Sequence, residues 1–361
     1  MRTVRMLKRM DAILGRAALA LLPSARTGAF PPEIRRILFI RPGGIGDAVL
    51  LIPAIEAVKH AFPDSSIDVL AEKRNAEVFL LCQEVERVLH YDKFAELLFA
   101  IGRRYDVVID TEQWHRLSAV VARVLRAKMS MGFSTNERSR MFSHAVSYSQ
   151  DDYEAKSFLC LIRPLAGETV FDPSHPFLSV TEQYRAEIER HLKHISNDGI
   201  IALFPGSSVA ERQWGRDRFH EVAKGLNARG HSIVVIGGKG DASDGIEIIR
   251  GLSNALNLAG KLSLPETAAV LTRSKLLITG DSGIMHLAHA VGTPIVALFG
   301  PGIEKKWAPR SSRVIVINKG LPCSPCTKFG YTSTCPIDAE CMKRIAVEEV
   351  MEKAMILLEQ V

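Results

Sequence analysis

Residues 37 to 47 read ILFIRPGGIGD, and this short stretch decides the fold. The apolar run Ile37–Ile40 predicts a buried strand, because it is short, uninterrupted and bounded by turn residues. The glycines that follow predict a tight turn, and we expect a helix from about Asp47 to His60. A buried strand that turns directly into a helix is the repeating unit of a parallel α/β sheet.

The same alternation continues along the chain and restarts near residue 199. Further strands are expected at 66–71, 85–91 and 105–110, and in the second half at 199–204, 232–236, 275–279, 295–299 and 314–317. We therefore predict two doubly wound domains facing a central cleft at the carboxyl ends of both sheets. The expected limits are 1–30 for an N-terminal amphipathic helix and linker, 31–180 and 181–345 for the domains, and 346–361 for a C-terminal helix packing across the body.

Charge is distributed unevenly in this chain of 361 residues, whose net charge is +6. Basic residues gather in residues 1–41 and 103–140, and such fields suit a phosphorylated lipid, a membrane surface or nucleic acid. Nucleic acid is disfavoured because these stretches lack interleaved aromatic residues. We expect Arg138 and Arg140 to contact an anionic ligand. The sequence contains no run of 18 apolar residues, so we expect no membrane-spanning helix.

The N-terminal residues predict a basic amphipathic helix. Its apolar members recur at helical spacing: Met6, Met10, Ile13, Leu14, Ala17 and Leu21. Such a helix binds an anionic bilayer or docks on the protein's own body. We expect a reversible contact with the inner leaflet, separate from the catalytic core, in a cytoplasmic protein whose thiols stay reduced.

The glycine-rich turn ends in a carboxylate at the helix N-terminus. Residues 44–49 lack the third glycine of a dinucleotide fingerprint and the Lys-Ser/Thr of a phosphate loop. Asp47 is therefore either a helix cap or a general base kept ionised by the helix dipole. Gly44 and Gly46 let a ligand approach the backbone closely.

Two loops of the second half carry the polar groups of a donor site. Ser207, Ser208 and Arg212 follow a strand and suit a diphosphate, although a plain polar loop has the same composition. The second loop holds Asp281, Ser282, Gly283 and His286, where a helix begins with free N–H groups. Ser282 and His286 lie one turn apart, so they share a face. A capping carboxylate plus a packed histidine is the alternative.

Four segments resemble the signatures of glycosyltransferase family 9, which contains the ADP-heptose–lipopolysaccharide heptosyltransferases. They are residues 37–47, 204–219, 257–264 and 281–301, in order and with the expected spacing. The resemblance implies a GT-B architecture of two Rossmann-like domains and inversion without a catalytic metal. It implies that Asp47 deprotonates the acceptor, that Asp281, Ser282, Gly283 and His286 hold the donor's sugar and diphosphate, and that Lys261 and the Gly238 loop lie nearer the nucleotide.

One signature departs from the family pattern. The family has Lys-x-Trp-Pro where this chain has Arg212-Gln213-Trp214-Gly215. Arginine keeps the charge but binds bidentately, which changes the expected phosphate geometry. We expect loss of the proline to loosen the start of the next helix.

The implied partners are a nucleotide-sugar donor, a phosphorylated glycolipid acceptor and the inner leaflet. We assign the acceptor contacts to Gly44, Gly46, Arg138 and Arg140. Rival functions are a sugar-nucleotide epimerase or hydrolase and a non-catalytic glycolipid-binding protein. Four cysteines lie within nineteen residues: Cys323, Cys326, Cys335 and Cys341. A structural zinc site, free thiols and disulfides all remain open for them.

Overall fold

The computed structural model describes residues 11–28, 30–193, 195, 199–328 and 331–360. The chain divides into two compact units, Met1–Phe171 and Asp172–Val361. The division falls before the expected boundary at residue 180, because the intervening residues bond within the second unit. The backbone N–H groups of Phe177 and Leu178 both donate to the carbonyl of Ala290.

The first unit is a six-stranded parallel sheet in the order β3-β2-β1-β4-β5-β6. Its strands are β1 (Arg36–Arg41), β2 (Ser66–Ala71), β3 (Val85–His90), β4 (Val107–Asp110), β5 (Met129–Phe133) and β6 (His144–Val146). Its main helices are α3 (Ile45–Ala61), α4 (Phe94–Gly102), α5 (Leu117–Val124) and α6 (Glu154–Ala166), with the 3₁₀ turns η2 (Ala76–Leu81) and η3 (Glu137–Met141). The predicted strands are confirmed, whereas β5 and β6 were not predicted.

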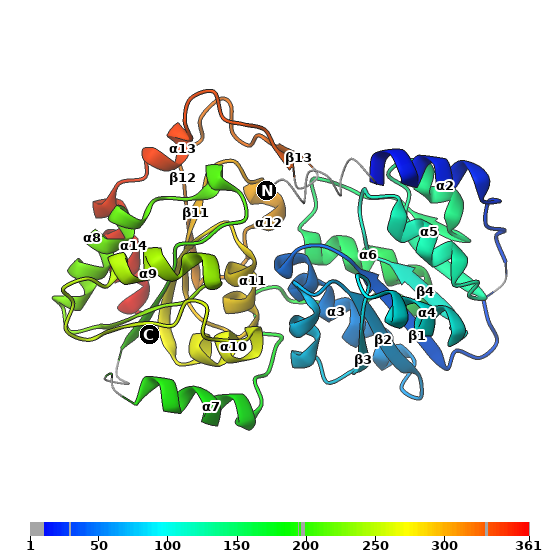
Figure 1. Ribbon diagram of the computed structural model, residues 1–361, viewed down its shortest axis with the longest axis horizontal. Coiled ribbons are helices and arrows are strands. Elements are labelled where there is room, and N and C mark those ends of the chain that lie inside the picture. Colours follow the sequence, from blue (N-terminus) through cyan, green and yellow to red (C-terminus); the bar gives the residue numbers. More distant parts are fainter. Residues whose placement is uncertain (1–10, 29, 194, 196–198, 329–330, 361) are drawn as a thin grey trace. The chain divides into compact units, whose positions relative to one another are not determined.

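The chain order of this sheet creates a topological switch point. From β1 the chain moves outward to β2 and β3, then returns to place β4 on the other side of β1 (Figure 1). The loops after β1 and β4 therefore leave the sheet in opposite directions, which is where ligands of doubly wound sheets bind. Asp47 follows β1, and Gln113 follows β4.

The described part of the N-terminal segment packs on the first unit, as η1 (Asp11–Gly15) and α2 (Arg16–Leu21). Asp11 is buried and accepts the backbone N–H groups of Arg116 and Leu117 at the start of α5. Leu19 belongs to the hydrophobic core. The prediction that this segment stands apart from the core is therefore wrong for residues 11–21. Met6 and Met10, also assigned to the amphipathic helix, lie outside the described residues.

The second unit repeats the same topology, in the order β12-β11-β10-β7-β8-β9. Its strands are β7 (Ile200–Phe204), β8 (Ser232–Val235), β9 (Ala255–Asn257), β10 (Ser274–Gly280), β11 (Ile295–Phe299) and β12 (Val314–Asn318), with a hairpin of β13 (Thr327–Lys328) and β14 (Tyr331–Thr332). Its helices are α7 (Glu182–Leu192), α8 (Arg216–Asn227), α9 (Ala242–Ile248), α10 (Leu264–Thr272), α11 (Gly283–Ala290), α12 (Glu304–Trp307), α13 (Glu340–Lys343) and α14 (Val347–Leu358), with the turns η4 (Ala210–Arg212) and η5 (Lys239–Asp241). The switch point here lies between β7 and β10.

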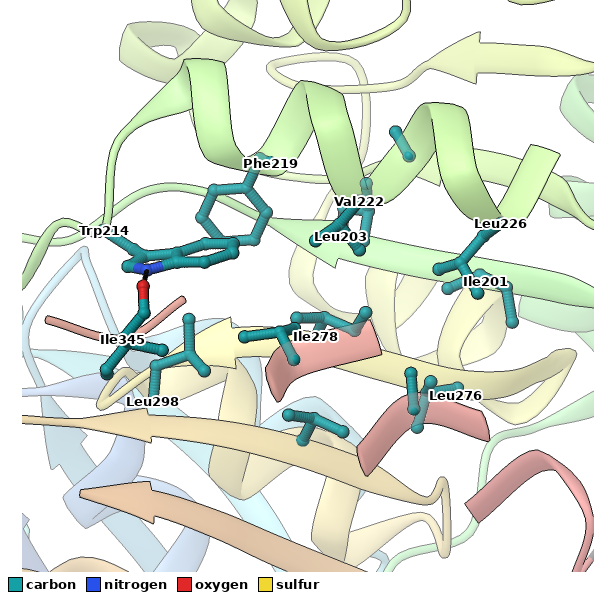
Figure 2. Packing of buried hydrophobic residues seen from close by; sticks show 14 of the residues in the cluster. Ile201, Leu203, Trp214, Phe219, Val222, Leu226, Leu276, Ile278, Leu298 and Ile345 are labelled. Atoms are coloured by element: carbon teal, nitrogen blue, oxygen red, sulfur yellow. Dashed lines mark hydrogen bonds between the residues drawn. The ribbon is translucent and has the colours of Figure 1, made fainter. Parts of the chain in front are cut away.

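Trp214 anchors the loop after β7 in the core of the second unit (Figure 2). Its side chain is 2% exposed and stacks edge-on against Phe219 of α8. The indole N–H donates to the carbonyl of Ile345 at 3.0 Å, so the polar end of the ring is satisfied. This anchor fixes the loop that carries Arg212. Among the described residues, no helix is both long and apolar enough to cross a bilayer.

Candidate active site

Asp47 lies in the first turn of α3, where its carboxylate faces the helix N-terminus. The turn before α3 depends on Gly43, which adopts a φ of 122° and brings the chain close to Arg41. A Cβ at Gly43 would stand 2.9 Å from the Arg41 guanidinium. The turn therefore needs glycine for both conformation and space. Asp47 itself is partly buried.

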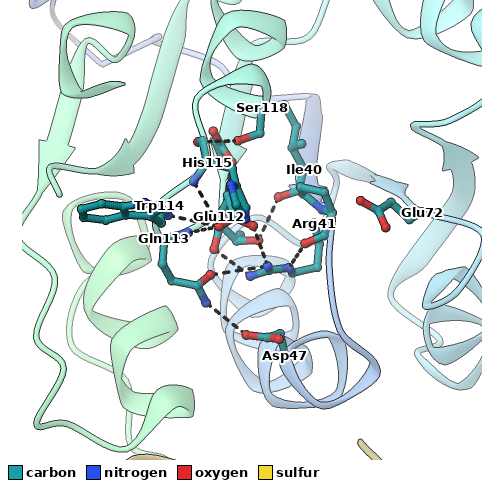
Figure 3. A network of polar contacts seen from close by, with 12 residues as sticks. Ile40, Arg41, Asp47, Glu72, Glu112, Gln113, Trp114, His115 and Ser118 are labelled. Atoms are coloured by element: carbon teal, nitrogen blue, oxygen red, sulfur yellow. Dashed lines mark hydrogen bonds and ion pairs between the residues drawn. The ribbon is translucent and has the colours of Figure 1, made fainter. Parts of the chain in front are cut away.

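Arg41 connects the loop after β1 to the loop after β4 (Figure 3). Its guanidinium donates to the Thr111 carbonyl at 2.8 Å and pairs with Glu112 at 3.1 Å. Burial opposes the charge on Arg41, but the carboxylates of Asp47 and Glu112 outweigh it and raise its pKa. The second carboxylate oxygen of Glu112 accepts the N–H groups of Gln113 and Trp114. The loop after β4 is thus fixed by its own acidic residue.

Gln113 links this framework to Asp47. Its side-chain amide nitrogen donates to Oδ1 of Asp47 at 3.1 Å (Figure 3). It also donates to Oε1 of Glu154, on α6, at 2.5 Å. The other oxygen of Glu154 accepts the hydroxyl of Tyr148 at 3.0 Å. Burial, together with the Glu154 carboxylate, raises the pKa of Tyr148, so its hydroxyl remains a donor. Sequence reasoning missed Gln113 and Glu154, because no local motif marks them.

Arg138 does not contact solvent, so the prediction that it binds an acceptor is wrong. Its side chain is fully buried and pairs with Asp110 at the end of β4. It also donates to the Glu112 carbonyl and to the Ser118 hydroxyl. Arg138 therefore holds the end of β4 and the loop after it together through these contacts. Arg140 is exposed and donates to Ser24 at 3.2 Å, which leaves its assignment to the acceptor a prediction.

In the second unit, Asp281 and Arg212 pair at the switch point. The distance from Nη1 of Arg212 to Oδ2 of Asp281 is 2.9 Å, and the side chains are 16% and 6% exposed. Arg212 also donates to Thr327 of β13 at 3.4 Å. A Cβ at Gly302 would stand 2.0 Å from the same Asp281 oxygen, so only glycine leaves room for the pair. Two predicted donor residues are therefore brought into direct contact.

The N-terminus of α11 carries the remaining groups of this loop. Ser282 is the N-cap and accepts the N–H of Met285 at 3.3 Å, while Thr279 bonds its hydroxyl at 3.1 Å. His286 is 3% exposed and stacks edge-on against Trp307. Burial, aided by His289 and Arg212, lowers its pKa to about 3. His286 is therefore a neutral imidazole, able to donate or accept a hydrogen bond but not to carry charge at neutral pH.

The remaining predicted donor residues lie in three turns, which follow β7, β8 and β9. Ser207 is partly buried and accepts the N–H of Val209, and Ser208 is exposed. Gly238 is exposed, and its N–H donates to Asp241 at 2.8 Å. The N–H of Gly260 donates to the carbonyl of Gly237, which brings the turn of Lys261 beside the Gly238 loop. Lys261 is exposed and donates to the Asn257 carbonyl.

Comparison with known proteins identifies the family. The family model described as glycosyltransferase family 9 (heptosyltransferase) matches residues 95–335, more than half of the chain. The chain belongs to glycosyltransferase family 9. A lipopolysaccharide heptosyltransferase 3 of Escherichia coli is 27% identical over 295 residues, covering 75% of this chain and 85% of that protein. A lipooligosaccharide heptosyltransferase 2 of Haemophilus influenzae is 25% identical over 304 residues, covering 78% and 88%.

Solved structures of family 9 share this fold. The Escherichia coli protein described as ADP-heptose lps heptosyltransferase II superimposes with a TM-score of 0.75 at 23% identity, covering 90% of this chain and 99% of that one. The predicted GT-B type of fold, with two Rossmann-like domains, is confirmed by these neighbours and by the two six-stranded sheets.

At the departure from the family 9 pattern, residues 212–215, the backbone adopts a conformation that suits glycine. Gly215 precedes α8 with a φ of 107°. Proline is fixed near −65° and has no access to this conformation. Proline would therefore not fit this backbone, and the looser start of α8 stays a prediction.

The cysteine cluster of residues 323–341 contains no disulfide in the part of the chain that the structure describes. All six cysteines fall within the described ranges and carry free thiols. In those ranges, no group of three or more cysteine, histidine or acidic side chains is arranged to hold a metal ion. Cys323 is exposed, Cys326 and Cys335 are partly buried and Cys341 is buried. The structural zinc stays a prediction, which elemental analysis of untagged protein checks.

Proposed function

We propose that this protein is an inverting heptosyltransferase, which transfers a heptose from ADP-heptose to the phosphorylated inner core of lipopolysaccharide. Membership of family 9 supports the reaction class. The names of the relatives support heptose and lipopolysaccharide or lipooligosaccharide, and the neighbouring structure described as an ADP-heptose enzyme supports the donor. The proposed catalysis requires no metal ion.

In the proposed reaction, an acceptor hydroxyl attacks the anomeric carbon of the donor. The new carbon–oxygen bond forms as the bond from that carbon to the phosphate oxygen breaks, and ADP leaves with the electron pair. Asp47 takes the proton of the hydroxyl. The observation that carries this assignment is a half-buried carboxylate at a helix N-terminus, with one oxygen held by Gln113.

Negative charge grows on the leaving diphosphate, and the second unit supplies groups for it. Arg212 and the N–H groups at Ser282 and Gly283 would stabilise that charge. The remaining donor contacts are assigned to Ser207, Ser208, Gly238, Lys261, Asp281 and His286. As a neutral imidazole, His286 would serve as a hydrogen-bond partner of the donor. Gly44, Gly46 and Arg140 are assigned to the acceptor.

Asp47→Asn tests the proposed base. The change keeps the size of the side chain and removes its basicity, so transfer should fall roughly 10²–10⁴-fold. Donor binding, measured by thermal shift with ADP, should be unchanged because the donor residues are in the other unit. Asp64→Asn, at an exposed position in the loop after α3, is the matched control. Near-normal turnover of Asp47→Asn at saturating acceptor contradicts the assignment.

The rival functions separate in the same assay. An epimerase or hydrolase consumes the nucleotide sugar without acceptor, whereas the proposed enzyme releases ADP at a useful rate only when acceptor is present. A glycolipid-binding protein retains lipopolysaccharide but turns over no donor. Either result overturns the proposed activity.

We also propose that the N-terminal segment contacts the inner leaflet while remaining packed on its unit. Opposite its buried face, Ile13, Leu14 and Leu21 are 70%, 51% and 86% exposed. Exposed apolar side chains beside arginines suit an anionic bilayer. Ile13→Glu with Leu21→Glu should reduce sedimentation with anionic liposomes and leave the melting temperature unchanged. Val170→Glu, at another exposed apolar position, is the control, and equal sedimentation of all three proteins contradicts the contact.

A further inference from the structure

We infer that Gln113 is the positioning residue of the proposed base: its amide orients the Asp47 carboxylate and separates it from the buried carboxylate of Glu154. This inference rests on the proposed role of Asp47. It assigns a function to a residue that no motif of the chain marks and that follows a different strand from Asp47.

The geometry fixes the orientation of the amide. The nitrogen of Gln113 has two protons, and it lies within hydrogen-bond distance of one oxygen of Asp47 and one of Glu154. The amide oxygen faces the guanidinium of Arg41, at 3.5 Å from Nη2. Turning the amide over would bring its oxygen against two carboxylates and its protons against a cation. Asp47 therefore meets a donor at Oδ1, while its other oxygen is left for a substrate proton.

Charge explains why a donor is needed at this point. The bonded oxygens of Asp47 and Glu154 both contact one nitrogen, so they lie within about 6 Å, the range in which like charges raise each other's pKa. Glu154 is fully buried and has little access to water. Each N–H···O bond stabilises the ionised form of its acceptor. The amide thus places a hydrogen-bond donor between two neighbouring carboxylates.

Other charged and titratable groups lie near the carboxylates of Asp47 and Glu154, on the neighbouring strands and loops. Arg41 on β1 attracts both anions, and the carboxylates of Asp47, Glu112, Glu154 and Asp110 together raise the pKa of its guanidinium against the effect of burial. Tyr148 donates to the far oxygen of Glu154. Arg138 is engaged with Asp110 below the loop. These groups are unchanged in the variants below, so differences between variants report on Gln113 and Glu154.

Two substitutions should move the pH dependence of transfer in opposite directions. In Gln113→Leu the donor is lost while the volume is kept, so the acid limb of the kcat/KM profile should move up by roughly one pH unit. In Glu154→Gln the neighbouring negative charge is lost, so the acid limb should move down. Gln183→Leu, whose amide bonds Glu187 on the exposed face of α7, should leave the profile unchanged. If Gln113 has only a structural role, Gln113→Leu lowers activity but leaves the acid limb of the kcat/KM profile at the same pH.

A second readout does not depend on turnover. The side-chain carboxyl of Asp47 can be followed by ¹³C NMR and assigned by its disappearance in Asp47→Asn. Its titration should move up in Gln113→Leu and down in Glu154→Gln. Affinity for ADP should be equal in all variants.

The outcomes distinguish the inference from the function. If Asp47→Asn abolishes transfer but neither Gln113→Leu nor Glu154→Gln moves the limb or the titration, the base stands and the inference is wrong. If the titrations move but Asp47→Asn still transfers heptose normally, Gln113 orients a carboxylate that is not the base, and the proposed mechanism fails. Unfolding of Gln113→Leu leaves Glu154→Gln as the deciding variant, and an unmoved titration there overturns the inference.

Discussion

The two units place their functional charges at the same topological point but hold them differently. In the first unit, the loops after β1 and β4 are joined by a continuous network in which Arg41, Glu112 and Gln113 are buried and Asp47 is partly buried. In the second, the loops after β7 and β10 are joined by the ion pair of Arg212 with Asp281, whose side chains are 16% and 6% exposed. The strand order that creates the two points is the same.

The difference matches the two kinds of task proposed here. A base must be held in one orientation and one ionisation state, and a buried network with few alternative partners does this. A donor site must release its product, and a partly exposed pair can exchange partners with a bound diphosphate. On the proposed function, the same fold would support a rigid site in one unit and an exchangeable site in the other.

The largest expected effect comes from breaking the fully buried ion pair of Arg138 and Asp110 in the first unit. Arg138→Leu leaves Asp110 uncompensated among fully buried atoms, and should lower the free energy of unfolding by about 3–5 kcal/mol. Arg212→Leu should cost much less stability, because the Arg212 side chain reaches solvent, but should weaken binding of the donor. Urea unfolding and ADP titration of both variants measure the two effects. Equal destabilisation would remove the proposed contrast between a rigid and an exchangeable site.

An intermediate effect is expected from Gly302→Ala. The added methyl would stand 2.0 Å from Oδ2 of Asp281, so the carboxylate must move and its pair with Arg212 must change. Affinity for ADP should fall about tenfold, equivalent to about 1.4 kcal/mol. Gly102→Ala, where a Cβ meets nothing within 4 Å, is the control. Unchanged ADP affinity with a stable fold would show that the pair does not shape the donor site.

The smallest effect concerns the opposite pH responses of the two units. Burial and the Glu84 carboxylate raise the pKa of Glu56, in α3, to about 7. An acid with a raised pKa in the folded state makes the first unit less stable as the pH rises from about 4.5 to 7. Burial lowers the pKa of His289 to about 4, so the second unit loses stability as the pH falls from about 6.5 to 4.

Glu56→Gln should therefore raise the melting temperature at pH 8 by roughly 2–4 °C and leave it nearly unchanged at pH 4. His289→Gln should instead reduce the loss of stability between pH 6.5 and 4. Differential scanning calorimetry of both variants across this range checks the signs. A Glu56→Gln protein that gains stability mainly at acid pH contradicts the burial of that carboxyl.

Local sequence determined the architecture and the positions of the loops. Short apolar runs such as Ile37–Ile40 and Ile295–Phe299 predict buried strands, because they are too short for a buried helix and are bounded by turn residues. Glycine and capping residues after them predict where each strand turns into a helix. Asp47, Asp281 and Ser282 were found in this way, since each stands beside a turn signal in the same stretch of chain.

Tertiary structure alone decided which groups meet. Gln113 and Glu154 contact Asp47 from other elements, and nothing in their neighbouring residues indicates this. Arg138 reads as a surface cation in a basic stretch, yet it is buried because Asp110, at the end of another strand, compensates its charge. Burial, pairing and orientation depend on contacts between residues distant in the chain, and these arise only when the sheet brings its strand ends together.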